Sequence, residues 1–215
     1  MTVKELRELA RHFVPSMLSV QETQVHKTRV ENLKNTLGFY HAFAVSSTGR
    51  SGGLGIFWNN KMRVDLLPYS QYHIDVILTE GDKEPWRLTC VYGEAQLSEQ
   101  HKTWSLLKFI KSSSSLSWVC IGDFNEVLHH PEHVGIQQRS RAQMEGFREM
   151  VDVCGLNDHG FEGRNWTFEK KVAGGSYYHV RLDRGLATAD WCNSFLCAKV
   201  KHLAAAASDL GPILL

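Results

Sequence analysis

The chain has 215 residues, of which 43% are hydrophobic and 22% are charged, and its formal net charge at pH 7 is +1. No apolar run approaches the roughly 18 to 20 residues that a membrane-spanning helix needs, which argues against insertion into a membrane. The near balance of charges gives no strong whole-chain attraction for nucleic acid, so any such binding has to come from a local patch.

The first part of the chain predicts a helix, a strand and a second helix. In "MTVKELRELARHF" apolar residues recur at helical spacing between charged ones, as in a helix that packs on a core and unlike a secretory signal. The run "PSMLSV" predicts a buried strand that ends at the polar word "QET". The segment "VHKTRVENLKNTLGF" predicts a single helix that stops at Gly38.

The middle and the end of the chain alternate strands with helices. From Phe39 to Tyr92, short β-branched and aromatic runs between turn sequences such as "STGRSGG" predict antiparallel strands. Helices are predicted over about 99–111 and 141–154, with the apolar strand "WVCIG" between them, and a small helix near 190–195. This order predicts a layered α/β sandwich, and we expect one domain over residues 1–215.

Short polar motifs stand where predicted strands end: "QET" after "MLSV", "GDFNE" after "WVCI", "RLDR" after "SYYHV" and "SD" before "LGPILL". One such word is most often a cap or a turn, because Asp and Asn bond to local backbone. Four of them call for a common cause.

Hydrolysis of a phosphodiester would explain these words. It needs a hard cation on oxygen ligands, a group that positions the attacking water, and donors to the phosphate. Glu22 and Asp209 can supply oxygen ligands. Asp123 with Asn125 can hold a water, because the i, i+2 spacing places both side chains on one side of an extended segment. Tyr92 can donate a hydrogen bond from its phenol.

The words "QET", "GRSGGLGIFW", "VY", "IGDFNEVL", "GLNDHGFEG" with "NWTF", "RLDRGLA" and "SD" with "GPILL" together resemble the endonuclease/exonuclease/phosphatase family. The resemblance is strongest to its AP-endonuclease-like branch and to the endonuclease domain of plant non-LTR retrotransposons, and it runs from about residue 2 to residue 215. It implies a four-layered α/β sandwich of two mostly antiparallel sheets flanked by helices, with a metal-dependent site.

The resemblance also implies a role for each residue at a motif position. Glu22 would bind Mg²⁺ or Mn²⁺. Asp123 would orient or deprotonate the attacking water, and Asn125 would hold water and phosphate. Tyr92 would contact the phosphate.

The end of the chain departs from the family pattern. The resemblance implies that Asp183 orients a histidine that touches the scissile phosphate, and that Asp209 assists the metal or that histidine. The family's last word is Ser-Asp-His, but here the histidine position is Leu210. Leucine has no hydrogen-bond donor, so it cannot take the role of the histidine that Asp183 would orient. Loss of one preorganised donor typically lowers turnover by about a hundred- to a thousandfold.

Two further departures concern the first strand and the segment after Tyr92. Family members begin with a strand that carries a "WN" word, and this chain starts downstream of it. We therefore expect the first strand to be missing, and either aggregation or another segment that covers the exposed sheet edge. In "YGEAQ" the family often has Pro-Asn after the tyrosine, which places one phosphate contact in doubt.

Nucleic-acid contacts are predicted at Arg50, Arg139, Arg141 and Trp166. Arg139 and Arg141 lie in the loop after the "GDFN" strand, and arginine often contacts phosphate. Trp166 in "NWTF" can stack on a base or deoxyribose, or instead close the core. We expect most other basic residues near strand ends on the solvated surface (Lys27, Arg29, Lys170, Lys171, Arg181 and Arg184), together with the histidines His129, His130 and His133.

The sequence thus predicts a metal-dependent DNA endonuclease-like domain of retrotransposon origin, weakened at its catalytic histidine. One alternative is a noncatalytic module that binds DNA, RNA or protein, and a second is a phosphatase or lipid phosphodiesterase. The five cysteines are scattered and mostly lie in apolar segments (Cys90, Cys120, Cys154, Cys192 and Cys197). Free thiols of this kind favour a reducing compartment, which predicts a nuclear or cytoplasmic location.

Overall fold

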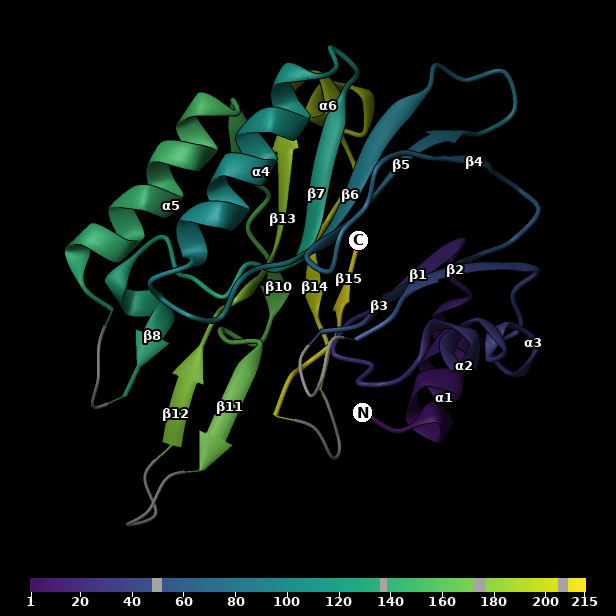
Figure 1. Ribbon diagram of the computed structural model, residues 1–215, viewed down its shortest axis with the longest axis horizontal. Helices are drawn as coiled ribbons and strands as arrows, with labels where there is room; N and C mark the ends of the chain where they lie inside the picture. The colour runs from purple at the N-terminus through teal and green to yellow at the C-terminus, as the bar shows by residue number, and fades with distance from the viewer. Residues whose placement is uncertain (48–51, 136–138, 172–176, 205–208) are drawn as a thin grey trace. The chain divides into compact units, whose positions relative to one another are not determined.

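A computed structural model describes residues 1–47, 52–135, 139–171, 177–204 and 209–215. The chain divides into two compact units, unit 1 (Met1–Tyr92) and unit 2 (Gly93–Leu215). Helices and strands alternate in both units (Figure 1), which confirms the α/β class expected from the sequence. The single domain expected over the whole chain stays a prediction.

Unit 1 combines short helices with antiparallel sheets. Its helices are α1 (Val3–Phe13), α2 (Lys27–Glu31) and α3 (Lys34–Leu37). Its strands are β1 (Met17–Val20), β2 (His41–Val45), β3 (Leu54–Trp58), β4 (Arg63–Leu66), β5 (His73–Thr79) and β6 (Trp86–Tyr92). The strands β1, β3 and β2 form one antiparallel sheet in that order, and β4, β5 and β6 pair antiparallel in sequence.

Two predictions in this unit are wrong in detail. The single helix expected before Gly38 is two short helices, α2 and α3, because the chain turns at Asn32 and Leu33. Asparagine is a poor helix former, and here its N–H bonds to the carbonyl of Thr28 as a C-cap. The strand β1, expected to be buried, is half-buried along its length. It stands at the end of the strand order β1–β3–β2 and pairs with β3.

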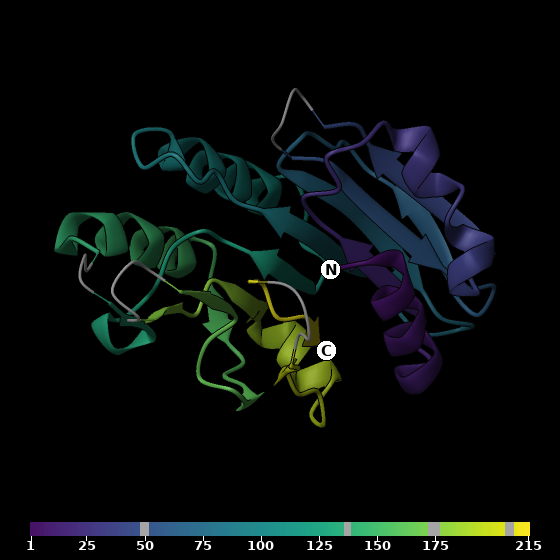
Figure 2. The same cartoon turned by 90° about the horizontal axis from the view of Figure 1, so that it is seen from below.

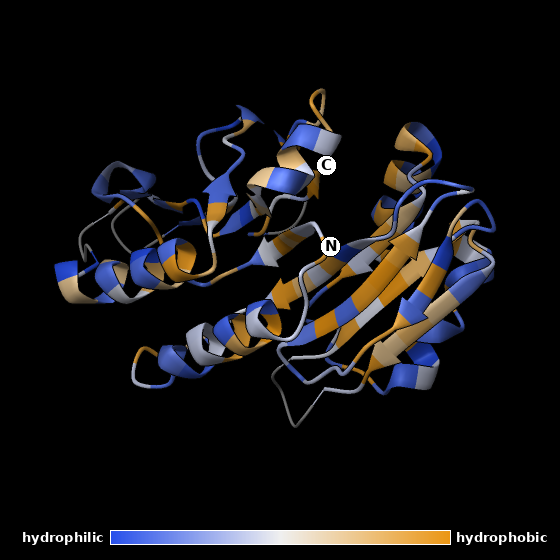
Figure 3. Cartoon of the chain, turned by 90° about the horizontal axis from the view of Figure 1, so that it is seen from above, coloured by the Kyte–Doolittle hydropathy of each residue, from blue (hydrophilic) through white to orange (hydrophobic). Residues whose placement is uncertain are grey.

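One hydrophobic cluster of unit 1 joins α1, α2 and α3 to the strands β2 and β3, and Figure 2 shows the helices on one face of this sheet. Its buried residues are Ala10, Val30, Leu37, Phe39, Ala44 and Phe57. Gly55 in β3 allows α2 to approach, since a Cβ there would lie 2.6 Å from Cγ1 of Val30. Burial of one large apolar side chain is worth about 1.5 to 3 kcal/mol, so this cluster fixes the helices to the sheet. Figure 3 shows hydrophobic residues concentrated in the strands and hydrophilic ones in the turns.

Unit 2 contains longer helices and several small sheets. Its helices are α4 (Gln100–Ser112), α5 (Arg141–Val153) and α6 (Ala189–Ser194), with a 3₁₀ turn, η1, at His130–Glu132. Its strands are β7 (Trp118–Asp123), β8 (His133–Val134), β9 (Leu156–Asp158), β10 (Glu162–Gly163), β11 (Phe168–Lys171), β12 (Tyr177–Val180), β13 (Asp183–Thr188), β14 (Lys201–His202) and β15 (Ile213–Leu214).

The strand β13 pairs antiparallel with β7 on one side and with β9 on the other. The strands β11, β12 and β8 form a second sheet, and β10, β14 and β15 a third. Helices α4 and α5 lie side by side, and the Trp104 and Phe147 rings stack 4.7 Å apart between them. The helices predicted over 99–111, 141–154 and 190–195 are confirmed to within one or two residues. No helix within the described ranges is long and apolar enough to cross a membrane.

Candidate active site

The turn after β1 holds Glu22 in an unusual backbone conformation. Both Glu22 and Gln24 have a φ of 52°, in the left-handed region that non-glycine residues rarely occupy. The N–H of Thr23 donates to the carbonyl of Gly53 at 3.2 Å, and a Cβ on Gly53 would lie 2.3 Å from Oγ1 of Thr23. The glycine in "GRSGG" therefore holds the "QET" turn against β3. Such strain costs about 1 to 3 kcal/mol for a residue and is most often found at functional sites.

Glu22 and Tyr92 are brought together within unit 1. The Tyr92 hydroxyl donates to Oε1 of Glu22 at 2.6 Å, and the Gln21 side chain donates to the carbonyl of Val91 at 2.8 Å. Tyr92 is buried, whereas Glu22 is exposed. A buried phenol thus orients a carboxylate that is open to solvent. A hydrogen bond to a charged group of this kind is worth about 1.5 to 3 kcal/mol.

Asp123 and Asn125 are brought together within unit 2. Oδ1 of Asp123, the last residue of β7, accepts the Asn125 N–H at 2.7 Å. Asn125 has a φ of 54°, so the segment turns here and is not extended as the i, i+2 spacing suggested. The Asn125 side chain donates to the carbonyl of Gly93 at 2.7 Å, and the Gly93 N–H donates to the carbonyl of Asp123 at 2.7 Å. These bonds fix the carboxylate and the amide relative to each other.

In "YGEAQ" the residue after Tyr92 is Gly93, which lies close to the "GDFN" turn. A Cβ at this position would lie 2.5 Å from the carbonyl oxygen of Phe124. In this chain, a larger residue at position 93 would require the "GDFN" turn to shift. The glycine therefore permits the close contact between residues 93 and 123–125.

Asp183 lies opposite Asp123. It is the first residue of β13, and the antiparallel ladder pairs it directly with Asp123 at the end of β7. Both carboxylates are buried. The Asp183 N–H donates to Oγ1 of Thr167 at 3.0 Å, which ties the start of β13 to the segment before β11. Side chains at directly opposed positions of a ladder are neighbours on one face, so the structure brings two predicted catalytic carboxylates together.

The C-terminal segment Asp209–Gly211 is attached to the beginning of β11. The carbonyl of Asp209 accepts the Glu169 N–H at 2.8 Å, and the Gly211 N–H donates to the carbonyl of Thr167 at 2.6 Å. Leu210 forms a β-bridge with the first residue of β11 and is half-buried, while Asp209 is exposed. Thr167 is the residue whose hydroxyl binds the start of β13. Leu210 is thus attached to the same short segment as Asp183.

The predicted nucleic-acid contacts have different environments. Trp166 is half-buried, stacks on the His179 ring at 4.1 Å, and donates from Nε1 to Glu169 at 3.1 Å. It therefore belongs to the surface of the β11–β12 hairpin and not to the core. Arg141 is exposed at the first position of α5. Arg50 lies outside the described residues.

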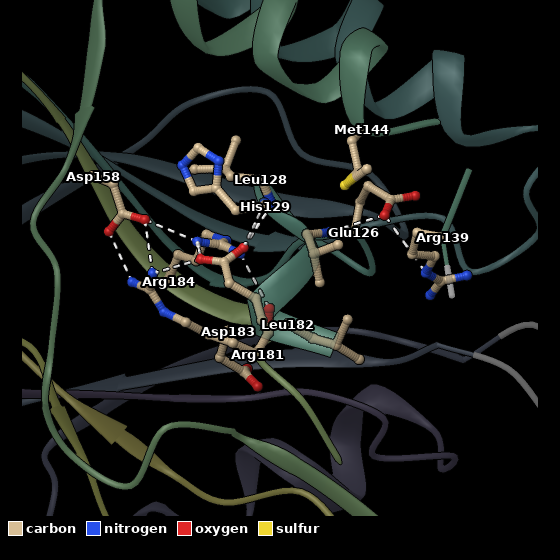
Figure 4. A network of polar contacts seen from close by, with 12 residues as sticks. Glu126, Leu128, His129, Arg139, Met144, Asp158, Arg181, Leu182, Asp183 and Arg184 are labelled. Carbon is tan, nitrogen blue, oxygen red and sulfur yellow. Dashed lines mark hydrogen bonds and ion pairs between the residues drawn. The ribbon is translucent and has the colours of Figure 1, made fainter. Parts of the chain in front are cut away.

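Arg139 turns toward the interior. Its side chain is 20% exposed, and Nε lies 3.5 Å from Oε1 of Glu126, at ion-pair distance (Figure 4). Nη2 lies 3.4 Å from the carbonyl of Asn125. Burial raises the pKa of Glu126, and the Val127 N–H and the charge of Arg139 oppose that rise.

Arg181 and Arg184, expected on the surface, are buried in a network with Glu132 and Asp158 (Figure 4). Arg184 bonds to Glu132 at 2.5 Å and to Asp158 at 2.8 Å, and Arg181 reaches both carboxylates at 3.0 Å. Burial alone would raise the pKa of Glu132 and of Asp158, but the arginines outweigh it, and both pKa values are lowered. The surface prediction fails because Arg181 directly follows β12 and Arg184 is the second residue of β13, where both side chains reach Glu132 and Asp158 instead of solvent. His133, also expected on the surface, is buried against Tyr178.

Glu22 has the chemistry of a ligand for a hydrated magnesium ion. Mg²⁺ prefers carboxylate oxygens and usually keeps several waters, so one or two protein carboxylates are enough. The exposed, oriented carboxylate of Glu22 fits that requirement. Within the described ranges, no three or more His, Cys, Asp or Glu side chains gather as a metal cage. The donor set thus suits an ion that is held largely by water and substrate.

The comparisons with known proteins agree with this arrangement. Residues 2–195 match the Endonuclease/Exonuclease/phosphatase family. The chain belongs to this family. The match ends before Asp209 and Leu210, so their assignment rests on the "SD" and "GPILL" words. None of the curated proteins matches the chain.

Solved structures of endonucleases and of a phosphatase share the fold of this chain. The endonuclease domain of TRAS1, a telomere-specific non-LTR retrotransposon, is 17% identical with a TM-score of 0.75, covering 98% of this chain and 90% of that one. An AP endonuclease from Archaeoglobus fulgidus is 16% identical with a TM-score of 0.76, covering 98% and 92%. ANGEL2, a 2′,3′-cyclic phosphatase, is 16% identical with a TM-score of 0.58, covering 99% and 76%. The chain therefore has the fold of a phosphoesterase-type domain.

Several residues of the site are not marked as functional by any sequence motif. Gln21 bonds to the main chain of Val91, the residue before Tyr92. Gln100 and Thr167 bond to the main chain of Asn125 and Asp183 themselves. Their contacts join positions that are 15 to 70 residues apart in the chain. Only the polarity of Gln100 at a position that helix spacing marks as inward-facing could have drawn attention to it.

Proposed function

We propose that this chain is a metal-dependent DNA phosphodiesterase domain of the endonuclease type, related to retrotransposon endonucleases and weakened at one catalytic position. The observation that supports this most is the pair of left-handed turns at Glu22 and Asn125. In each turn a hydrogen bond fixes the side chain that the family motif assigns to chemistry. Strained backbone costs stability, so its occurrence at these two positions argues for a function that requires it.

In this proposal the residues divide the work. Glu22 would hold Mg²⁺ or Mn²⁺, which would supply positive charge to the phosphate. Tyr92 fixes the direction of the Glu22 carboxylate. Asp123 accepts a proton from the attacking water, while Asn125 restricts the position of that water. Asp183 and Asp209 support this chemistry from β13 and from the C-terminal segment.

Nucleic acid is the substrate class that we favour. The family words resemble those of retrotransposon endonucleases, and endonucleases are among the proteins that share the fold. Arg141 is exposed for phosphate contact and Trp166 presents an aromatic ring on the β11–β12 hairpin. We therefore propose DNA as the partner, with RNA as the alternative nucleic acid, and a nuclear or cytoplasmic location.

Leu210 is the reason that we propose weakened turnover. Its side chain has no donor for charge that develops on the phosphate, and loss of one such donor lowers turnover by about a hundred- to a thousandfold. Its main chain is bonded to β11 as a β-bridge, so the position itself is formed. A histidine there would be attached to the same segment as Asp183.

Nicking of supercoiled plasmid with Mg²⁺ or Mn²⁺ tests the proposal. The variants are the parent chain, Leu210→His, and Leu210→His with Asp123→Ala. We expect slow or undetectable nicking by the parent, faster nicking by Leu210→His, and none after Asp123→Ala. If the parent nicks as fast as Leu210→His, the proposal that Leu210 weakens turnover is contradicted. If no variant nicks the plasmid, the proposed phosphodiesterase activity is contradicted.

A noncatalytic nucleic-acid-binding module is the second candidate. The absence of a donor at Leu210 favours it, because a surface that binds DNA does not need one. Salt-sensitive binding of DNA by the parent chain, without metal-dependent cleavage by Leu210→His, would support this candidate. Release of phosphate from a small ester would instead favour a phosphatase.

A further inference from the structure

A side chain of α4, a helix outside the family motifs, holds the main chain at Asn125. Gln100, the first residue of α4, is 4% exposed, and its Nε2 donates to the carbonyl of Asn125 at 2.9 Å. Nη2 of Arg139 lies 3.4 Å from the same oxygen. Two side chains from segments about 40 residues apart thus converge on one carbonyl. That carbonyl belongs to the residue whose φ is 54°.

Arg139 is itself held by Glu126, the residue that follows Asn125. Glu126 is fully buried, its Oε1 accepts the Val127 N–H at 2.9 Å, and the same atom lies 3.5 Å from Nε of Arg139. A buried carboxylate is costly without a positive partner, so the interaction keeps the guanidinium directed inward. Figure 4 shows the guanidinium of Arg139 beside the Glu126 carboxylate.

We propose that Gln100 and Arg139 are positioning residues that hold the Asp123–Asn125 turn, and that Arg139 is not a phosphate ligand. The catalytic part of this inference rests on the proposed phosphodiesterase function. The carbonyl of Asn125 is fixed on one side by Gln100 and Arg139, and its side chain is fixed on the other by Gly93. With both ends fixed, the turn keeps the left-handed conformation that places Asn125 beside the Asp123 carboxylate.

The two arginines of "QQRSRAQ" look equivalent in the sequence but have different roles in this proposal. Arg141 is exposed on α5, whereas Arg139 is largely buried against Glu126. An arginine that contacts DNA phosphate contributes about one unit to the salt dependence of binding, the slope of log K against log salt concentration. A positioning residue leaves that slope unchanged and instead lowers turnover, since a misplacement of about 1 Å can cost a hundredfold in rate.

The first experiment measures the salt dependence of DNA binding for the parent, Arg139→Gln and Arg141→Gln. We expect the slope of Arg141→Gln to fall by about one and that of Arg139→Gln to equal the parent. An equal fall in both would overturn the assignment of Arg139. If Arg139→Gln does not fold because Glu126 is left without its cation, Glu126→Gln with Arg139→Gln replaces it.

The second experiment does not need DNA or activity. Hydrogen exchange of the Asn125 N–H, which is bonded to Asp123, is compared in the parent, Gln100→Leu and His101→Ala. His101 is the exposed neighbour in the same helix and serves as the matched control. We expect exchange at Asn125 to accelerate about tenfold or more in Gln100→Leu alone. Unchanged exchange in Gln100→Leu would show that Gln100 does not hold the turn.

Steady-state nicking links the turn to catalysis. In the Leu210→His background we expect Gln100→Leu to lower kcat by about ten- to a hundredfold while KM stays within about twofold. A raised KM with unchanged kcat would refute positioning. If Leu210→His itself does not nick DNA, the proposed function has failed, and the exchange result still decides whether Gln100 holds the turn.

Discussion

The turns that follow β1 and β7 differ from the C-terminal segment Asp209–Gly211 in how their geometry is maintained. In the turns, Glu22 and Asn125 occupy left-handed conformations, and hydrogen bonds fix both backbone and side chain. In the C-terminal segment, main-chain bonds to β11 hold the chain while Asp209 remains exposed. The geometry of the turns thus depends on several residues together. At the C-terminal segment the proposed chemistry would depend on one side chain, so a single substitution would remove it without disturbing the fold.

The largest expected effect comes from the buried charges that hold the strand of Asp183. Arg184→Met leaves Glu132 and Asp158 with one arginine between them, and removing one partner from a buried ion pair costs about 3 to 5 kcal/mol. We therefore expect the free energy of unfolding in urea to fall by that amount. Lys199→Met, which breaks an exposed pair with Glu162, is the control and should leave it essentially unchanged. Equal losses of unfolding free energy in Arg184→Met and Lys199→Met would show that burial does not determine the contribution of these ion pairs.

Gly93→Ala should damage the turn after β7 directly. The added Cβ would lie 2.5 Å from the Phe124 carbonyl oxygen, and overpacking of this kind costs about 1 to 3 kcal/mol. Gly146→Ala in α5 is the matched control. Its Cβ would meet ordinary van der Waals contacts at 3.7 Å, and we expect a gain of about 0.5 to 1 kcal/mol. Thermal unfolding of the two variants should shift in opposite directions, and a stable Gly93→Ala would contradict the close contact.

Acid should weaken the strand that pairs with the C-terminal end. Burial lowers the pKa of His202 in β14 below 6.5, and Arg181 and Arg184 add to this, although the Arg164 carbonyl opposes it. The unfolded chain takes up a proton near pH 6.5 that the folded chain does not. Stability from His202 is therefore fully present above about pH 6.5 and is lost as the pH falls through the lower folded pKa, by at most about 1.4 kcal/mol for each pH unit.

Urea unfolding at pH 7.5, 6.5 and 5.5 measures this dependence. His202→Phe should reduce this dependence, because phenylalanine keeps the stack on Phe161 and does not titrate. Some slope should remain, because burial also lowers the pKa values of His73 and His133. The exposed His12→Phe is the control. A parent curve without slope between pH 6.5 and 5.5 would contradict the prediction, as would an identical slope in His202→Phe.

The smallest expected effect on stability is that of Leu210→His. The side chain is half-buried and the segment is held by main-chain bonds that the substitution leaves in place. We expect the free energy of unfolding to change by less than about 1.5 kcal/mol, below the value of a fully buried leucine. Loss of cooperative unfolding in this variant would show that the C-terminal segment depends on its side chain for the fold as well.

The sequence by itself determined the class of fold and marked the residues that we propose for the chemistry. Helical and alternating apolar patterns placed α1, α4, α5 and the strands, because burial of one face imposes that spacing on the chain. The ordered polar words marked Glu22, Asp123 and Asn125, because hydrolysis of a phosphodiester needs oxygen ligands and a positioned water. The family match confirms the resemblance on which their roles were proposed.

Only the tertiary structure decided which polar residues serve the fold and which are free to act. Arg181 and Arg184 stand beside loops in the sequence but are buried against carboxylates that are distant along the chain. The half-buried Arg139 lies at ion-pair distance from the buried Glu126. Gln100 reaches Asn125 across 25 residues. Local patterns report the spacing of neighbours in the sequence. A buried charge is defined by partners that only the folded chain brings within hydrogen-bond distance, so its role cannot be read from its own segment.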